Sequence, residues 1–407
     1  MKIRVWGARG SIPAPLKLEE VEEKICWAIL GMPDMDTNDM ETIRTYVRKL
    51  PPLLRGTAGS NTSCVEIQAE GETFIVDAGT GLRELGLELM KGPCGHGQGT
   101  LHLFISHPHW DHIQGFPFFV PAFIPGNHIF VYGVHDLKTA FEDQQRSLNF
   151  PVPLSTMQAQ IEFISLEVGQ SFSIGQVRIN TIQNAHPGNS YSYRFEDPHS
   201  VLVYASDVEF KQSDVDDASV QPYIEFFSDA DALIFDAQYT LREAWQRVDW
   251  GHSSALIGVE LARAAGVKKL ILFHHDPTYS DAELREIRST AAAYQAQNTA
   301  LPTCEVIVAY EGLTLDLAPP GAVALQFTPG GEVAILTPTS VFDARGADQL
   351  VQQLVHLAEQ DAAASPIIDL SQVETLTTAS LRLLVSCAEK ERALLLSWLL
   401  PRTASAR

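Results

Sequence analysis

The sequence reads Ser-His-Pro-His-Trp-Asp-His at residues 106–112, directly after the apolar run Leu-His-Leu-Phe-Ile at residues 101–105. The apolar run predicts a buried strand. The proline in the second stretch argues against a helix, so we expect three histidines and one aspartate on a tight loop where the strand ends. Imidazole and carboxylate groups are ligands that Zn, Mn and Fe share. The stretch therefore predicts a metal-binding loop.

Outward from this loop, the pattern H-x-H-x-D-H after a buried strand resembles the metal motif of the metallo-β-lactamase superfamily. The opening W-G-x-R-G-S-I-P at residues 6–13 resembles the start of a phosphodiesterase-like branch of that superfamily. Residues 56–64 resemble its G-G-N-T-S-C text, with Ser60 where a glycine is usual. The resemblance covers about residues 1–320. It implies an α/β fold, an αββα sandwich that holds one or two metals at one edge.

Position by position, the resemblance also implies a set of metal ligands. One metal would be held by His107, His109 and His186, and a second by Asp111, His112 and His274, with Asp207 bridging the two. His275 is an alternative to His274, because the sequence does not say which neighbour points inward. Asp77 would orient the metal loop rather than bind a metal. These ligands are nitrogen and oxygen donors, which suits two divalent ions and does not choose between Zn and Mn.

The catalytic residues follow from the same resemblance. His252 lies in Gly-His-Ser, like the G-H-S/T histidine of the transfer-RNA 3′-processing endonucleases and related phosphodiesterases. There the histidine works with an upstream acid to protonate the leaving oxygen, and that acid maps onto Asp236, where the family usually has glutamate. Asp111 could also handle the proton of the nucleophile. A structural alternative for His252 is a polar residue at a helix N-terminus.

Substrate size is constrained by two features. The transfer-RNA enzymes carry a long RNA-gripping arm between the third motif and the bridging aspartate, but here only 21 positions separate His186 from Asp207 (207 − 186). The net charge of −21 disfavours a large nucleic-acid footprint, although a metal pair can still attract a small anion. We therefore expect a small phosphodiester, with cyclic nucleotides as the leading candidates.

Other residues leave alternatives open. Arg9 could face a substrate phosphate or form a structural salt bridge. The proline-broken apolar stretches at residues 115–125 and 149–154 could wall a pocket for a flat group or pack as core beneath loops. Residues 16–55 depart from the compact family pattern, with helical periodicity over 18–29 and 39–50. This insertion could be a lid, an oligomer contact or an inert decoration.

The C-terminal part is expected to be separate. Proline and glycine clusters mark a linker at residues 321–331. Beyond it we expect strands at residues 332–336 and 366–370 and helices at 342–359 and 381–392. The text Ile-Asp-Leu-Ser-Gln-Val-Glu at residues 368–374 resembles the STAS domain, a small α/β regulatory fold, so residues 332–407 would form a partial STAS domain. Thr378 falls at the position that such domains phosphorylate, without the usual aspartate and glycine around it. A docking or dimerising appendage, for a homo-oligomer or a regulatory protein partner, is the other interpretation.

Composition bounds the remaining possibilities. The five cysteines are scattered without a C-x-x-C pair, and the N-terminus has no signal-peptide pattern, so we expect a reduced, cytoplasmic protein. The absence of any run of 18 apolar residues predicts no membrane span.

The leading hypothesis is a dinuclear metallophosphodiesterase. The alternatives are hydrolysis of a thioester or lactone, and a signalling or sensor protein that acts through its C-terminal domain.

Overall fold

The computed structural model describes residues 1–211, 218–297 and 301–317, together with the backbone of five short strands between residues 323 and 376. The chain divides into two compact units, one formed by Lys2–Asp316 and the other by Leu317–Arg407 with Met1. All the site residues expected from the sequence lie in the first unit. Among the described helices, none combines the length and the hydropathy that a bilayer-spanning segment needs.

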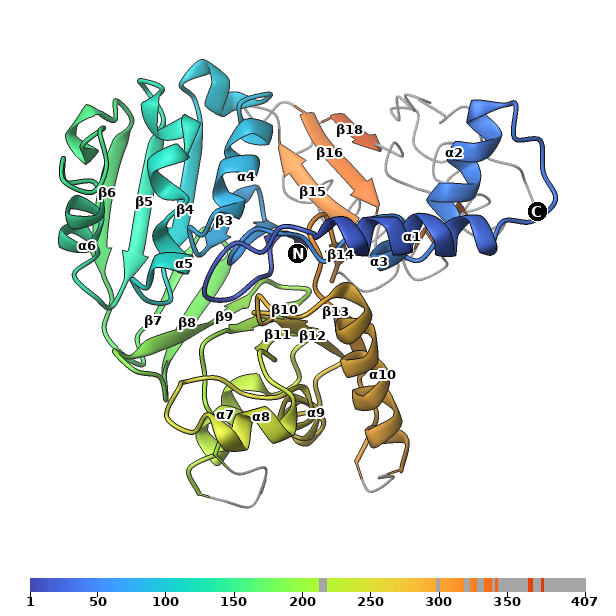
Figure 1. Ribbon diagram of the computed structural model, residues 1–407. Coiled ribbons are helices and arrows are strands. Elements are labelled where there is room, and N and C mark those ends of the chain that lie inside the picture. The colour runs from blue at the N-terminus through green and yellow to red at the C-terminus, as the bar shows by residue number, and fades with distance from the viewer. Residues whose placement is uncertain are drawn as a thin grey trace. The chain divides into compact units, whose positions relative to one another are not determined.

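The first unit contains two large sheets, which Figure 1 shows in sequence colours. The first sheet has seven strands, in the spatial order β14 (Thr314–Asp316), β1 (Lys2–Gly7), β2 (Cys64–Ala69), β3 (Glu72–Val76), β4 (Thr100–Phe104), β5 (His128–Gly133) and β6 (Gln160–Ser165). The second also has seven, in the order β13 (Glu305–Val308), β12 (Lys269–Phe273), β11 (Ala232–Asp236), β10 (Val201–Ala205), β9 (Ser190–Glu196), β8 (Val177–Asn184) and β7 (Ser171–Ile174).

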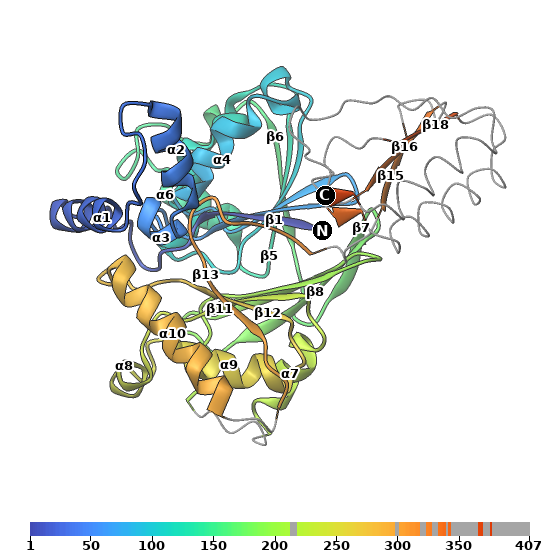
Figure 2. The same ribbon diagram turned by 90° about the vertical axis from the view of Figure 1, so that its right-hand side faces the viewer.

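Helices cover the outer faces of both sheets, as Figure 2 shows for α4 and α6 on the first and α7, α9 and α10 on the second. The longer helices that follow the insertion are α4 (Gly81–Leu89), α6 (Leu137–Gln144), α7 (Gln221–Phe227), α9 (Ala255–Ala264) and α10 (Asp281–Gln297). Shorter turns are α5 (Trp110–Ile113), α8 (Leu241–Gln246), η1 (Pro93–His96), η2 (Phe116–Phe118), η3 (Val120–Phe123) and η4 (Leu154–Thr156). The αββα arrangement expected from the sequence is confirmed.

Local chemistry explains these elements. Strand β8 alternates, with Val177, Ile179 and Thr181 buried, because successive side chains of a strand point to opposite faces. Helix α9 begins where the Ser254 side chain accepts the free backbone N–H of Ile257, and nearly all of its side chains are buried against the second sheet. The burial of apolar side chains on both faces of each sheet is the main stabilising contribution.

Aromatic side chains fill the space between the sheets. Phe104 of β4 lies edge-on to Phe195 and Tyr193 of β9, with ring centroids 5.3 Å away in both cases. Phe74 of β3 lies 5.7 Å from Phe195. Edge-to-face pairs at such distances are favourable, so the two sheets are held in a fixed register. This fixed register positions the strand ends that carry the site.

Strand direction brings the polar residues together. Strands β3, β4, β5 and β6 run parallel to one another, as do β10, β11, β12 and β13. Parallel neighbours end at the same edge of a sheet, and polar residues that follow them collect there. Asp77 follows β3, Asp207 follows β10 and His274 follows β12, which places all three at one edge of the sandwich.

The insertion is helical, as the sequence predicts. It contains α1 (Leu18–Leu30), α2 (Met40–Lys49) and the single turn α3 (Pro52–Arg55). The Lys24 ammonium, 2.6 Å from the Asp281 carboxylate at the start of α10, ties α1 to the main body. None of the side chains of α1 is buried.

The second unit is described only as strands. Strands β15 (Val323–Phe327), β16 (Val333–Pro338) and β18 (Ser365–Ile368) form one sheet, and β17 (Val341–Phe342) pairs with β19 (Thr375–Leu376). Strands β16 and β18 run parallel and fall on two of the stretches that the sequence predicts as strands. The predicted helices and Thr378 lie outside the described residues, so the STAS-like domain remains a prediction.

Candidate metal centre

Histidine and aspartate side chains from both sheets converge at the edge described above. Their donor atoms form overlapping groups, each within 4.8 Å, that could hold metal ions. The members are His107, His109, Asp111, His112, His186, Asp207, Asp236, His252 and His274. Every metal ligand and catalytic residue expected from the sequence is in this set.

Asp207 lies between two of these groups. One of its carboxylate oxygens, Oδ1, is 3.8 Å from His107 Nε2 and 4.0 Å from His186 Nε2. The other, Oδ2, is 3.2 Å from His112 Nε2 and 3.4 Å from His274 Nε2. A carboxylate whose two oxygens face different histidine groups has the geometry needed to join two cation sites.

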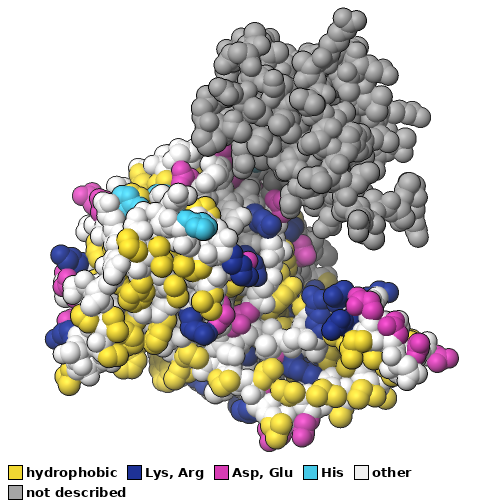
Figure 3. All heavy atoms as spheres, turned by 90° about the horizontal axis from the view of Figure 1, so that it is seen from above, with side chains coloured by type: hydrophobic (Ala, Val, Ile, Leu, Met, Phe, Trp, Pro, Cys, Tyr) yellow, Lys and Arg dark blue, Asp and Glu magenta, His cyan; other side chains and the backbone are white. Residues whose placement is uncertain are grey.

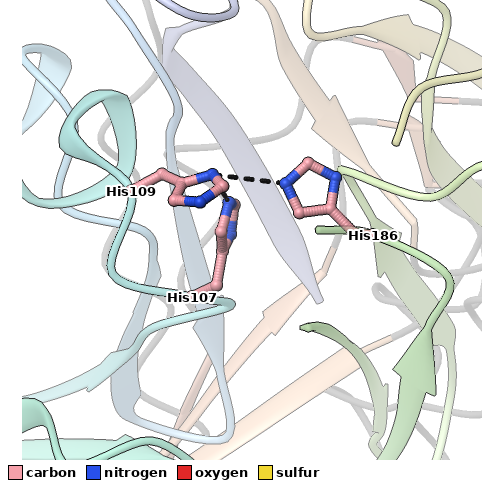
Figure 4. A group of neighbouring side chains, drawn as sticks. All are labelled: His107, His109 and His186. Atoms are coloured by element: carbon pink, nitrogen blue, oxygen red, sulfur yellow. Dashed lines mark hydrogen bonds between the residues drawn. The ribbon is translucent and has the colours of Figure 1, made fainter. Parts of the chain in front are cut away.

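The outer group contains His107, His109 and His186, which point toward one another in Figure 4. The His109 Nδ1 atom is 2.8 Å from His107 Nε2 and 3.2 Å from His186 Nε2. His109 is exposed, whereas His107 is buried. Burial and the neighbouring His112 lower the pKa of His107 well below its usual value, so its imidazole is neutral and available as a ligand.

The inner group contains Asp111, His112 and His274. The His274 Nε2 atom is 3.1 Å from Asp111 Oδ2 and 3.3 Å from His112 Nε2. Asp111 and His112 lie on helix α5 rather than on a loop, which corrects the expectation from the sequence. The helix begins at Trp110, after Pro108, so the proline ring does not interfere with its hydrogen bonds.

Three of the histidines are each oriented by a partner at the ring nitrogen that points away from the cluster. The Nδ1 of His112 is 2.7 Å from Asp77 Oδ2, and the Nδ1 of His274 is 3.1 Å from Gln238 Oε1. The Nδ1 of His186 is 2.9 Å from the Gly251 carbonyl oxygen. Because Nδ1 donates to these oxygens, Nε2 is the nitrogen that faces the cluster, and it can bind a cation once it has lost its proton. This pattern is typical of metal-binding histidines, so the residues fit a pair of divalent cations.

Asp77 orients the metal loop without entering the cluster. Its carboxylate accepts hydrogen bonds from Ser106 N at 2.8 Å, from Ser106 Oγ at 2.9 Å and from the Tyr204 hydroxyl at 2.7 Å, besides contacting His112. The residue is fully buried. It therefore fixes the backbone at the start of the loop and the ring of one histidine at the same time.

Backbone strain concentrates at the same place. Asp77, Asp207 and His274 have positive φ angles of 63°, 56° and 59°. Residues other than glycine rarely adopt this conformation, and it is maintained only when surrounding contacts enforce it. These positive φ angles fall just after the strands end, where the chain turns and the three side chains reach the cluster or its supporting contacts.

Two glycines are required by the rings of the cluster. A Cβ atom on Gly10 would lie 2.5 Å from His274 Nδ1, and one on Gly251, whose φ is +87°, would lie 2.1 Å from His186 Nδ1. Gly10 belongs to the opening motif, which also delivers the Ser11 backbone N–H to Asp111 Oδ2 at 2.7 Å. The opening motif is therefore a wall of the site.

The electrostatics of the cluster favour positive charge. His274 is buried, which by itself lowers its pKa, but Asp207, Asp111 and Asp236 raise that pKa to about 9. Burial likewise opposes ionisation of Asp207, yet His112, His274 and His107 hold its pKa well below the usual range. A buried site that stabilises carboxylates and draws in positive charge suits divalent cations.

His252 and Asp236 form a hydrogen-bonded pair beside the cluster. The His252 Nδ1 atom is 2.8 Å from Asp236 Oδ2, and the shorter aspartate side chain reaches it without difficulty. The Asp236 carboxylate also accepts the backbone N–H groups of Asp207 and Gln238. The pair expected from the sequence is present in a geometry that leaves His252 Nε2 free.

His275 and Arg9 face away from the cluster. His275 is buried and donates from Nε2 to the Ala309 carbonyl oxygen at 2.9 Å, so His274 is the neighbour that points inward. The Arg9 guanidinium is buried and donates to the carbonyl oxygens of Gly59, Asp276 and Tyr279. Of the two alternatives for Arg9, the geometry matches the structural role.

A hollow of about 420 Å³ opens over the cluster. Its lining residues are Ser11, Pro108, His109, Trp110, Asp111, Asp207, His252 and His274. The proline-broken stretches at 115–125 and 149–154 do not line it, and Phe116 and Phe119 are buried in the core.

Sequence reasoning missed Ser11, Gln238 and Trp110. Of these three, only Ser11 belongs to a sequence motif, the opening W-G-x-R-G-S-I-P, that could have placed it at the site.

Comparisons with known proteins agree with this geometry. A profile described as the Beta-lactamase superfamily domain matches residues 72–275, half of the chain. The chain belongs to the metallo-β-lactamase superfamily. It is accordingly a metal-dependent hydrolase of that superfamily, and its histidine and aspartate cluster is compatible with metal binding.

Relatives and solved structures extend the match beyond the profile. Ribonuclease Z of Halobacterium salinarum is 23% identical over 313 residues, covering 66% of this chain and 97% of that protein. The metallo-β-lactamase fold protein YhfI from Bacillus subtilis superposes with a TM-score of 0.51 at 19% identity, covering 77% of this chain and 98% of its own. Unliganded yeast PDE1 gives 0.51 at 14% identity, with the same coverage. At these identities the structures establish the shared fold.

Proposed function

We propose that this metallo-β-lactamase-fold protein is a dinuclear metallohydrolase that cleaves a small phosphodiester, with cyclic nucleotides as the first candidates. The observation that carries the proposal is Asp207, whose two oxygens face two histidine groups, with His252 beside them. The H. salinarum relative is named Ribonuclease Z, a phosphodiester-cleaving activity, which supports the bond type.

The proposal assigns the cluster to two ions. One would be held by His107, His109 and His186, and the other by Asp111, His112 and His274, with Asp207 shared between them. Cysteine is absent from these groups, so both Zn and Mn suit the donors. Two divalent ions held there would lower the pKa of water and neutralise charge on the scissile phosphoryl group.

The protein's own side chains supply the proton transfers. His252 donates from Nδ1 to Asp236, so its Nε2 faces the hollow that the residue lines. The Asp236 carboxylate holds the His252 ring in this orientation, and a protonated ring there can donate its Nε2 proton to the departing oxygen. Asp111 keeps one carboxylate oxygen free of the Ser11 N–H and can accept a proton from the attacking water.

A small substrate is favoured by the short connection between His186 and Asp207 and by the acidic charge of the chain. Strands β9 and β10 are joined by residues 197–200 alone, so no arm projects between His186 and Asp207. The chain carries a net charge of −21. On the face shown in Figure 3, lysine and arginine side chains form small groups among acidic ones. A long phosphate backbone is bound mainly through extended basic surfaces.

A substrate panel tests this function. We would measure hydrolysis of bis-p-nitrophenyl phosphate, cyclic nucleotides, a thioester and a lactone with added Mn or Zn, using Asp207→Ala as the control. The proposal expects phosphodiester turnover that vanishes in the variant. Turnover of the thioester or lactone alone would overturn it and favour the other hydrolytic chemistry.

A second candidate is processing of RNA 3′ ends, favoured by the relatives named Ribonuclease Z. A transfer-RNA precursor should be added to the panel. Cleavage of the precursor at a much higher kcat/KM than any small phosphodiester would replace the small-substrate proposal with this one, while leaving the assignment of the metal site intact.

The remaining expectations stay as proposals. A cytoplasmic location, and a regulatory or self-associating role for residues 332–407, rest on the sequence alone. Size-exclusion chromatography with light scattering of the full chain and of a chain ending at residue 320 would test the second.

A further inference from the structure

Trp110 is an exposed aromatic side chain inside the candidate site. It stands between the predicted ligands His109 and Asp111 and lines the hollow over the cluster. Its side chain is 81% exposed. A single exposed hydrophobic residue is ordinary on a protein surface, but this one is the large apolar side chain among lining residues that are otherwise mostly polar.

The backbone of Trp110 is held by hydrogen bonds, although its indole ring is exposed to solvent. Trp110 is the first residue of α5, and its carbonyl oxygen accepts the Gln114 backbone N–H at 2.7 Å. On one side the His109 ring contacts the rings of His107 and His186, and on the other Asp111 accepts the Ser11 backbone N–H. A flat, exposed ring on a rigid backbone loses little entropy when a ligand packs against it.

The hollow offers little else for recognition. Among its described lining residues there is no lysine or arginine, so in that part of the chain no fixed cation is available to grip further phosphates. Bound metals would attract a single scissile phosphate whatever its substituents. Selectivity among phosphodiesters must then come from the apolar and hydrogen-bonding walls, of which the Trp110 indole is the largest flat surface.

Resting on the proposed function, we propose that Trp110 is the stacking platform for a nucleobase, so that the substrate class is nucleoside phosphodiesters rather than phosphodiesters in general. Aromatic stacking tolerates any base because every base has a π face. The residue contacts substrate at a distance from the reacting bond. It therefore sets specificity without taking part in proton transfer.

Two esters with the same leaving group test this role in the full-length, metal-loaded protein. Thymidine 5′-p-nitrophenyl phosphate and methyl p-nitrophenyl phosphate differ only in the nucleoside. We expect Trp110→Ala to lower the ratio of their kcat/KM values roughly tenfold or more, and Trp110→Phe to retain most of that ratio. Trp245→Ala is the matched control, because Trp245 is 67% exposed on α8 and does not line the hollow.

A binding measurement separates this inference from the proposed function. Calorimetric titration with a hydrolysis-resistant thymidine phosphorothioate diester reports binding whether or not turnover occurs. Weaker binding to Trp110→Ala than to the native and Trp245→Ala proteins supports the platform even if no ester is hydrolysed, an outcome that would overturn only the proposed function. Equal binding to all three proteins, or an unchanged ester ratio in Trp110→Ala, would overturn the platform.

Discussion

The inner and outer ends of the histidine cluster are built differently. At the inner end, His112 and His274 are fully buried, and their rings are oriented by Asp77 and Gln238. At the outer end, His109 is exposed and borders the hollow. The inner end is therefore fixed by the scaffold before any ligand arrives, and it meets the hollow through Asp111 and His274, whereas the outer end presents the solvent-exposed ring of His109 there.

This difference assigns distinct tasks to the two ends. Buried, oriented donors favour tight cation binding, since little reorganisation is needed when the ion enters. The exposed His109 beside Trp110 can exchange water for substrate. Loss of a buried inner ligand should therefore affect metal content, whereas changes to His252 and Trp110, which line the hollow and are not assigned as ligands, should affect turnover or selectivity with the metals retained.

Loss of an inner ligand should have the largest effect. We expect His274→Ala to lower kcat/KM for bis-p-nitrophenyl phosphate by roughly 10³-fold or more, because the loss of a cation removes several kcal/mol of charge stabilisation. Metal content, measured by mass spectrometry, should fall as well. His275→Gln is the adjacent control and should keep both metals. Full metal content in His274→Ala would contradict the assignment.

Loss of the His252 ring, which pairs with Asp236 beside the cluster, should leave metal content intact. We expect His252→Ala to lower kcat by about 10²-fold or more, the usual contribution of a general acid, while both ions stay bound. A substrate whose leaving group needs no protonation, such as p-nitrophenolate, should be affected less than an alkyl ester. If the variant loses a metal ion instead, His252 is a ligand and not the acid.

Removal of a buried support should give a smaller effect. Asp77→Asn should weaken metal affinity by about 10- to 100-fold, because an amide cannot accept all the hydrogen bonds from the metal loop and His112. Tyr204→Phe removes one donor to the same carboxylate and should have a milder effect. Metal titrations followed by isothermal calorimetry would compare them. Native affinity in Asp77→Asn would show that the loop holds its shape without this carboxylate.

The smallest effect concerns pH and the histidine behind the inner end. Burial lowers the pKa of His275 to about 3, whereas an unfolded histidine titrates near 6.5. The unfolded chain therefore binds more protons between these values, and the free energy of unfolding falls as the pH falls. From pH 7 to 5.5 this one group should cost about 1 kcal/mol of stability.

Urea unfolding at the two pH values would measure this cost, with His275→Gln as the comparison. The variant keeps a donor for the Ala309 carbonyl oxygen but cannot be protonated. Its stability should fall by less over the same interval. An identical pH dependence in both proteins would mean that His275 does not titrate as a buried neutral ring.

Much of the site could be predicted because its ligands follow strands in chain order. His107, Asp207 and His274 each come after an apolar run whose strand has a parallel neighbour, and parallel strands deliver such residues to one edge. His186 instead follows the alternating strand β8, which pairs antiparallel with β9. The position of Asp111 on a short helix was not predicted, since the proline before it suggested an irregular loop. The helix begins beyond that proline.

The parts that escaped prediction depend on contacts between distant residues. Ser11 reaches Asp111 through its backbone N–H, and Gln238 reaches both Ser11 and His274, yet neither contact leaves a pattern in the sequence. The role of Trp110 could not be predicted, because its place between two metal ligands does not indicate whether its side chain is buried or exposed. The sequence offered the apolar stretch at 115–125 as a possible pocket wall instead, but its Phe116 and Phe119 rings are buried in the core.

The central claim is that Asp207 joins two cation sites that act together on a phosphodiester. The most direct test measures bound metal per chain and turnover of bis-p-nitrophenyl phosphate in the same preparations of the native protein and Asp207→Ala. The account predicts two ions and turnover in the native protein, with loss of at least one ion and of turnover in the variant. Undiminished turnover in Asp207→Ala, or two ions without any phosphodiester turnover in the native protein, would contradict it.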